Sequence, residues 1–78
     1  MDTSTFDPKA FLLFGLKHYG LEVIAEKGRH IQLKHEYEVE IEGPNLYKLI
    51  HQGMVVAPFG GVEELCEFVV QDIQLNYG

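Results

Sequence analysis

Apolar and polar residues alternate strictly along the middle of the chain. From Glu36 to Glu42 every second residue is a glutamate, and Tyr, Val and Ile stand between them. Successive side chains of a β-strand point to opposite faces, so this pattern predicts a strand with one apolar face and one acidic face. Because the alternation begins upstream, one straight strand over 29–42 would be roughly 45 Å long at about 3.3 Å per residue. A domain of this size has a radius of gyration of only about 11–12 Å, so we predict a bend or break at His35-Glu36.

Turn-forming residues on both sides of this segment predict hairpins. Upstream, Glu26-Lys27-Gly28 is read as a three-residue turn with Gly28 at positive φ. Downstream, the GPN sequence at 43–45 predicts another three-residue loop, because an odd loop keeps the apolar residues of both strands on one side. That register sets Ile41 opposite Tyr47, and it continues with the pairs Val39–Leu49, Tyr37–His51 and Glu40–Lys48.

A further tight turn is predicted at Gln52-Gly53. It leads to a short strand over Met54–Ala57, and Pro58 is expected to end the ladder because proline has no N–H to donate.

The two ends of the chain have the periodicity of helices. In the first, Asp7 is the predicted N-cap, Pro8 the first helical residue and Gly20 the left-handed C-cap. Phe6 and Phe11 have the spacing of a hydrophobic staple. Gly15 is expected to mark a close approach to the sheet. The predicted apolar face of this helix contains Phe11, Leu12, Leu16 and Tyr19, with Phe14 at its edge.

The second helix is predicted in FGGVEELCEFVVQDIQLNYG, after the glycine-rich corner at its start. Its expected buried stripe consists of Val62, Leu65, Cys66, Val69 and Ile73, with Phe68 beside it.

The predicted fold class is therefore α+β: a helix, a four-stranded antiparallel β-meander and a helix. Both helices are expected on the Val39/Ile41/Leu49 face of the sheet. Residues 1–5 are predicted to be a flexible tail, and residues 6–78 a single small domain. The expected core is formed by Phe11, Leu16, Val23, Leu33, Val39, Leu49, Leu65 and Val69.

Charge is distributed unevenly in this 78-residue chain, whose net charge is −6. Residues 36–78 hold eight of the acidic residues against Lys48 alone. Such a chain repels phosphate backbones, so a nucleic-acid partner is not expected. No apolar run reaches membrane length and no leader-like segment opens the chain, so we expect no membrane partner. With its single cysteine, Cys66, the chain is expected in the cytoplasm.

The predicted outward face of the sheet is the first candidate site. In this register Leu46, Ile50 and Val55 share that face with the acidic row and Lys48. Apolar residues beside charged ones are typical of a non-obligate protein interface. The row also fits a plain solvated face, which the pattern favours for the glutamates alone. The predicted partner-binding residues are Glu38, Glu40, Glu42, Leu46, Lys48, Ile50 and Val55.

The predicted function is a small non-enzymatic protein-interaction or regulatory domain, and self-association is left open. Its partner would be another protein chain, either a second copy or a basic protein. No nucleophile, acid–base pair or phosphate loop points to an enzyme.

The alternative is a ligand- or metal-binding accessory domain that uses His35, Tyr37 and His51, with Cys66 from the covering helix nearby. No tight pair of ligands such as CxxC or HxxxH supports it. We therefore expect no metal and no cofactor, and we expect the Cys66 thiol to be inert on its apolar stripe.

Overall fold

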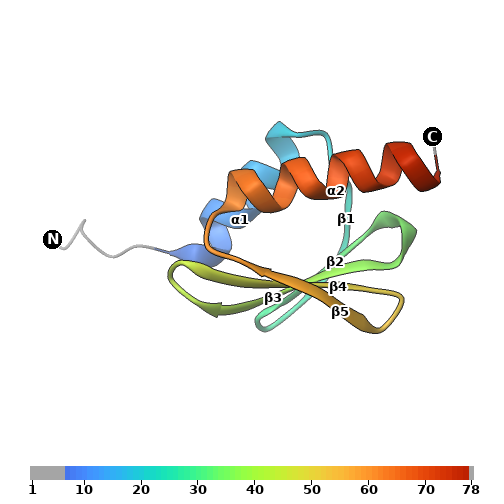
Figure 1. The fold of residues 1–78 in the computed structure, drawn as a ribbon. Coiled ribbons are helices and arrows are strands. Elements are labelled where there is room, and N and C mark those ends of the chain that lie inside the picture. Colours follow the sequence, from blue (N-terminus) through green and yellow to red (C-terminus); the bar gives the residue numbers. More distant parts are fainter. Residues whose placement is uncertain (1–6, 78) are drawn as a thin grey trace, which may run out of the picture.

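The computed structural model describes residues 7–77, and it places an antiparallel sheet beneath two helices (Figure 1). The strands follow one another across the sheet in the order β1-β2-β3-β4-β5, so the predicted meander is confirmed. The predicted number of strands, four, is wrong, because there are five. The predicted tail at 1–5 and the staple residue Phe6 lie outside the described residues. The elements are α1 (Pro8–His18), β1 (Val23–Lys27), β2 (His30–Leu33), a 3-10 turn (Lys34–Glu36), β3 (Tyr37–Gly43), β4 (Leu46–His51), β5 (Met54–Phe59) and α2 (Val62–Asn76).

The predicted break in the long alternating segment lies at the predicted place. His35 and Glu36 both adopt the left-handed conformation, with φ of 64° and 67°. The chain reverses there, and β2 pairs with β3, with Leu33 opposite Tyr37 and His30 opposite Glu40. The predicted topology pairs each half of the segment only with its outside neighbour and omits the pairing of the two halves with each other, so it has one strand too few.

Glu36 is expected to be a strained position, because a side chain in the left-handed region costs roughly 1–2 kcal/mol. Its side chain is exposed, and its backbone oxygen accepts a hydrogen bond from the N–H of Gln52 at 3.0 Å. We therefore expect Glu36→Gly to raise the free energy of unfolding by about 1 kcal/mol, since glycine adopts this conformation freely. Urea unfolding measures this, and a loss of stability in the variant would contradict it.

The downstream hairpins have the predicted register. Ile41 lies opposite Tyr47, and the pairs Val39–Leu49, Tyr37–His51 and Glu40–Lys48 are all present. The predicted three-residue loop at 43–45 is wrong, because Gly43 pairs with Leu46 and leaves a loop of two residues. A register shift between Ile41 and Gly43 keeps the apolar residues of both strands on one side. Gln52 and Gly53 form the predicted tight turn, both with positive φ.

Two predictions about the outer strands are wrong. Pro58 does not end the ladder: it lies opposite Lys48 inside β5, where the edge position makes its missing N–H tolerable. In the first hairpin Lys27 pairs with His30, so the loop has two residues rather than three. A register shift between Val23 and Ala25 compensates, and Val23 still lies opposite Leu33 as the apolar pattern requires.

The caps of α1 are those that the sequence predicts. The Asp7 side chain accepts hydrogen bonds from the backbone N–H groups of Lys9 and Ala10. At the other end Gly20 has a φ of 77°, and the Leu21 N–H donates to the Leu16 oxygen at 2.8 Å. These bonds satisfy backbone groups that a helix end otherwise leaves unpaired.

The buried face of α1 differs from the predicted one. Leu12, Gly15 and Leu16 are buried, whereas Phe11 is 48% exposed, so its assignment to the core is wrong. The reason lies at Gly15, which packs against α2 rather than against the sheet. A Cβ atom at that position would lie 2.3 Å from Cγ1 of Val62. This close helix contact turns Phe11 toward the edge of the interface.

The remaining core agrees closely with the prediction. Leu16, Leu33, Val39, Leu49, Leu65 and Val69 are buried, and Val23 is half-buried. The α2 stripe is confirmed, with Ile73 and Phe68 half-buried at its border. Both helices cover the apolar face of the sheet, so the opposite face is open (Figure 1). None of the helices in the described part of the chain is both long and apolar enough to cross a membrane.

Candidate functional site

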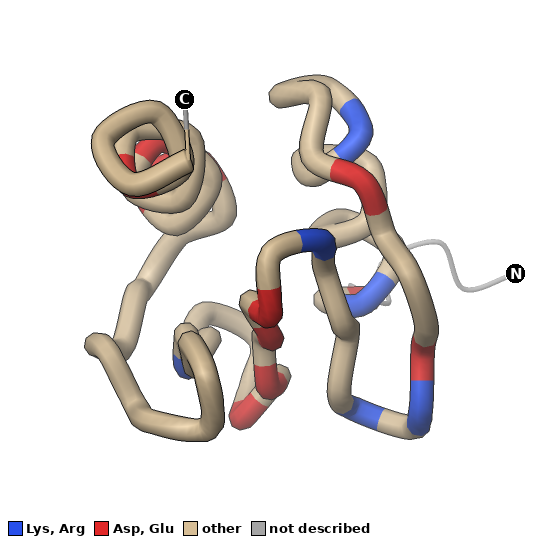
Figure 2. Tube along the Cα trace, turned by 90° about the vertical axis from the view of Figure 1, so that its right-hand side faces the viewer, with Lys and Arg blue, Asp and Glu red and all other residues tan. Residues whose placement is uncertain are grey.

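The first candidate site is the sheet face that points away from the helices, here called the outer face. Acidic residues follow one another along β3 in its middle (Figure 2). Glu38 lies opposite Ile50, and Glu40 lies opposite Lys48, across the β3–β4 ladder. Ile50 in turn lies opposite Val55 on β5. The strand register therefore brings the predicted partner-binding residues onto one surface.

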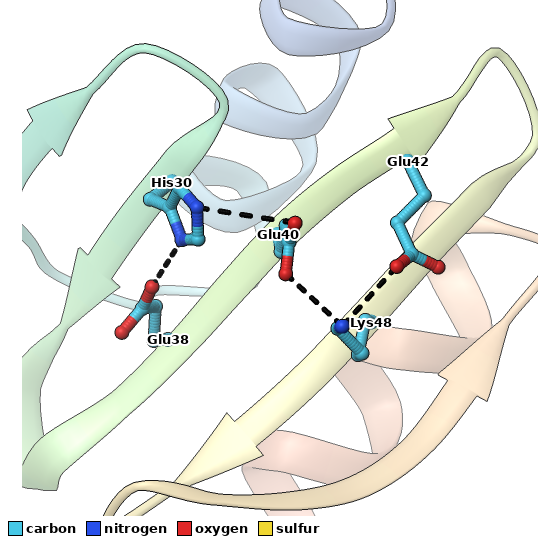
Figure 3. Close-up of polar contacts among 5 residues, drawn as sticks. All are labelled: His30, Glu38, Glu40, Glu42 and Lys48. Atoms are coloured by element: carbon cyan, nitrogen blue, oxygen red, sulfur yellow. Dashed lines mark hydrogen bonds and ion pairs between the residues drawn. The ribbon is translucent and has the colours of Figure 1, made fainter.

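A continuous row of charged contacts runs along this face, here called the charge ladder (Figure 3). Lys48 Nζ lies 3.2 Å from Glu40 Oε1 and 3.2 Å from Glu42 Oε2. His30 Nδ1 contacts Glu38 Oε2, and its Nε2 lies 3.9 Å from Glu40 Oε2. The five side chains thus alternate between carboxylates and nitrogen groups along three strands.

The ladder holds the carboxylates in position on the outer face, but it adds little to the stability of the domain. Its side chains are between 28% and 44% exposed, and ion pairs in contact with water add typically 1 kcal/mol or less. Hydrogen bonds to Glu40 and Glu42 raise the pKa of Lys48, so it stays charged at neutral pH. With three glutamates against one lysine, the ladder has a net negative charge.

Apolar side chains flank the ladder on the β4–β5 side. Val55 is 60% exposed and Leu46 is 42% exposed, while Ile50 is half-buried. Val56 is also exposed, whereas Met54 lies opposite His51 and therefore points to the helix side of the sheet.

His30 is the member of the ladder that the sequence analysis missed. The sequence does indicate that the His30 side chain points outward, because Ile31 and Leu33 point inward and their neighbours along the strand therefore point to the opposite face. The missing information was the pairing of β2 with β3, which sets His30 opposite Glu40.

The second candidate site, around His35, Tyr37 and His51, lies where the C-terminal end of α2 meets the sheet. The ring of His51 stacks on Tyr37 with centroids 4.0 Å apart, and its Nε2 lies 3.0 Å from the Tyr77 hydroxyl. His35 stacks on the other aromatic ring, Tyr77, at 4.4 Å. The structure does bring the three predicted residues close together, but Cys66 is buried in the hydrophobic core. Over residues 7–77 no three His, Cys, Asp or Glu side chains are grouped as metal ligands.

Burial keeps two groups protonated, the hydroxyl of Tyr37 and the thiol of Cys66. The pKa of Tyr37 is raised, first by burial and then by the hydrogen bond that its hydroxyl donates to Asp72. Burial, with a smaller effect of Glu67, raises the pKa of Cys66 to about 11. The thiol is therefore protonated at neutral pH, the inert state that the sequence predicts.

Tyr37→Phe should lower the stability by about 1–2 kcal/mol at pH 7, because it removes a hydrogen bond to a carboxylate. A tyrosine whose pKa is higher in the folded state keeps its full contribution below its unfolded pKa of about 10 and loses it as pH rises further. The wild type should therefore lose more stability than Tyr37→Phe between pH 9 and 11. Urea unfolding at several pH values measures this, and parallel curves for the two proteins would contradict it.

A cavity of about 300 Å³ lies beside His35, between the end of α1 and α2. Its apolar wall includes Leu21, Leu33, Val70 and Ile73, and Lys34 and Glu22 stand among its polar lining. These two side chains face each other, with Nζ 3.8 Å from Oε1.

Comparisons with known proteins give no relative from which a role for either site could be inferred. No family model matches the chain, and neither does any curated protein or solved structure.

Proposed function

We propose that this chain is a small non-enzymatic protein-interaction domain, and that its outer face docks another protein chain. The observation that supports this most is the combination on one face of exposed apolar side chains, Leu46 and Val55, with the charge ladder beside them. Solvated charge alone would explain the glutamates, but it gives no reason for the apolar border.

The energetics favour weak docking. Burial of Leu46, Ile50 and Val55 supplies several kcal/mol at about 25 cal/mol per Å². The loss of rotational and translational freedom on association offsets much of this. The three glutamates of the ladder outnumber its lysine, so a basic partner surface is electrostatically complementary and an acidic one is repelled.

Val55→Glu tests the apolar part of this surface, with Leu75→Glu as its matched control. Both residues are exposed, at 60% and 84%, but Leu75 lies on α2. The binding partner in the assay is a synthetic peptide that alternates lysine and leucine, titrated into the ¹⁵N-labelled protein. We expect resonances of the outer face to shift, Val55→Glu to raise the dissociation constant about tenfold or more, and Leu75→Glu to change it less than about threefold. Equal effects of both variants would contradict the proposal.

The cavity beside His35 supports a second candidate function, the ligand- or metal-binding domain built around His35, Tyr37 and His51. Its volume is at the lower limit of small-molecule sites. Titration with zinc tests the metal form of this hypothesis. Shifts of the His35 and His51 imidazole resonances that are complete at one equivalent of zinc would favour it over the docking proposal.

We also propose a reducing compartment, the cytoplasm, for this domain. The support is the single cysteine, which is buried in the core and has no second thiol in the chain to pair with.

A further inference from the structure

The two edges of the sheet differ in a way that bears on self-association. The β1 edge carries Glu26 and Lys27, and Glu26 is further paired with Lys9 on α1 at 3.2 Å. A register shift between Val23 and Ala25 also distorts that edge. Charged side chains and such irregularities are the usual protection of a sheet edge against pairing with another strand.

The β5 edge lacks the charged part of this protection. Its sequence, MVVAPF, contains no charged residue, and Met54, Val55 and Val56 are 73%, 60% and 41% exposed. Pro58 and the register shift opposite Leu49 and Ile50 are its only interruptions. Backbone groups on the free side of 54–57 are thus available next to an apolar surface.

We infer that β5 pairs with β5 of a second copy of this chain, antiparallel and about a two-fold axis, joining two sheets into one. A register centred between Val55 and Val56 sets Met54 opposite Ala57 and leaves Pro58 outside the new ladder. This goes beyond the proposed function, because it uses the edge of the sheet and leaves most of the outer face free.

The charge distribution favours the β5 edge over the outer face as the contact between two copies of the chain. Two chains of net charge −6 repel each other, and stacking the outer faces would bring the two charge ladders together. Edge pairing instead separates the two β3 rows by five strand spacings, about 24 Å. That is about three times the Debye length of 8 Å at physiological ionic strength. Because β5 has no charged side chain, it does not attract a charged segment of another protein. A second β5 strand is equally apolar and uncharged, so the two strands are complementary.

The contact is small, so the expected dimer is weak. Four paired residues on each side bury far less than the roughly 1,200 Å² or more of a stable interface. We therefore expect association in the high micromolar to millimolar range of protein concentration.

Sedimentation equilibrium over 10 μM to 2 mM tests the inference with Val56→Lys and its matched control Ile24→Lys. Both place a lysine at an exposed apolar position on an edge strand, Val56 on β5 and Ile24 on β1. The wild type and Ile24→Lys should approach the mass of two chains with dissociation constants within about threefold, and Val56→Lys should weaken the dimer about tenfold or more. A circular dichroism spectrum establishes that each variant is folded.

Three outcomes would overturn the inference: a wild type that stays monomeric at 2 mM, a Val56→Lys protein that dimerises normally, or an Ile24→Lys protein that does not. Glu38→Gln/Glu42→Gln separates the edge dimer from a face-to-face dimer. It should leave the dissociation constant within about twofold, because the ladders are far apart in the edge dimer. A clear gain in affinity would place the dimer on the outer face instead. None of these results depends on binding of the basic peptide, so the two proposals fail separately.

Discussion

Leu65→Ala is expected to lower the free energy of unfolding by about 2–5 kcal/mol. Leu65 has no exposed surface and lies on the α2 stripe, between Val62 and Val69, where the helix covers the sheet. Truncation removes apolar contacts and leaves a cavity that the surrounding side chains fill only in part. Small domains have a total stability of about 5–15 kcal/mol, so this single change removes a large share of it.

Leu75→Ala is the control for this substitution, since it deletes the same atoms from the same helix at a position that is 84% exposed. Its effect should stay within about 0.5 kcal/mol. Urea unfolding of the three proteins gives both values. A loss below 1 kcal/mol at Leu65 would mean that α2 is peripheral to the core, contrary to the fold described above.

Gly15→Ala is expected to destabilise the protein by about 1–3 kcal/mol, although alanine is the better helix former by up to about 1 kcal/mol. The added Cβ would lie 2.3 Å from Cγ1 of Val62 and 3.8 Å from the sulfur of Cys66. The first distance is far below any normal contact, so either Val62 leaves its preferred helical rotamer or α1 moves away from α2.

The second substitution Val62→Ala removes the atom that clashes with the new methyl group. Gly15→Ala should therefore cost less in a Val62→Ala background than in the wild type, with a coupling of about 1 kcal/mol or more in a double-mutant cycle. Additive effects would show that the α1–α2 contact at Gly15 is not the cause. A stabilised Gly15→Ala single variant would contradict the close approach itself.

The parts of the fold that follow from local periodicity were predictable from the sequence. The alternation around Val39 and Ile41 determines which side of the sheet is buried, and the need to keep the apolar residues of both strands on that side sets the β3–β4 register. The helix caps at Asp7 and Gly20 have purely local causes, and the structure agrees with the prediction for both. These features depend on residues that are neighbours along the chain.

Two of the wrong predictions are local: the loops of the first hairpin and of the β3–β4 hairpin are each one residue shorter than predicted, and a register shift compensates in both. The others concern contacts between distant segments. Phe11 is more apolar than Gly15, so periodicity assigned it to the core, whereas the close helix packing at Val62 requires the glycine to face inward. Pro58 reads as a strand terminator until the strand is known to lie at the edge. For the outer face the same limit applies: the seven predicted residues share one surface, but His30 joins the ladder only through the β2–β3 pairing.

The central claim, that the ladder glutamates select a basic protein surface, is tested most directly by two variants of equal net charge. Glu38→Gln/Glu42→Gln removes two carboxylates from the ladder, and Glu63→Gln/Glu64→Gln removes two from the first turn of α2. Binding of the lysine–leucine peptide is measured for both at 20 and 200 mM salt. We predict that the ladder variant loses about tenfold in affinity and most of its salt dependence, while the α2 variant stays within about threefold of the wild type. Equal losses in the two variants would show that the peptide responds to net charge alone, and would contradict a docking site on the outer face.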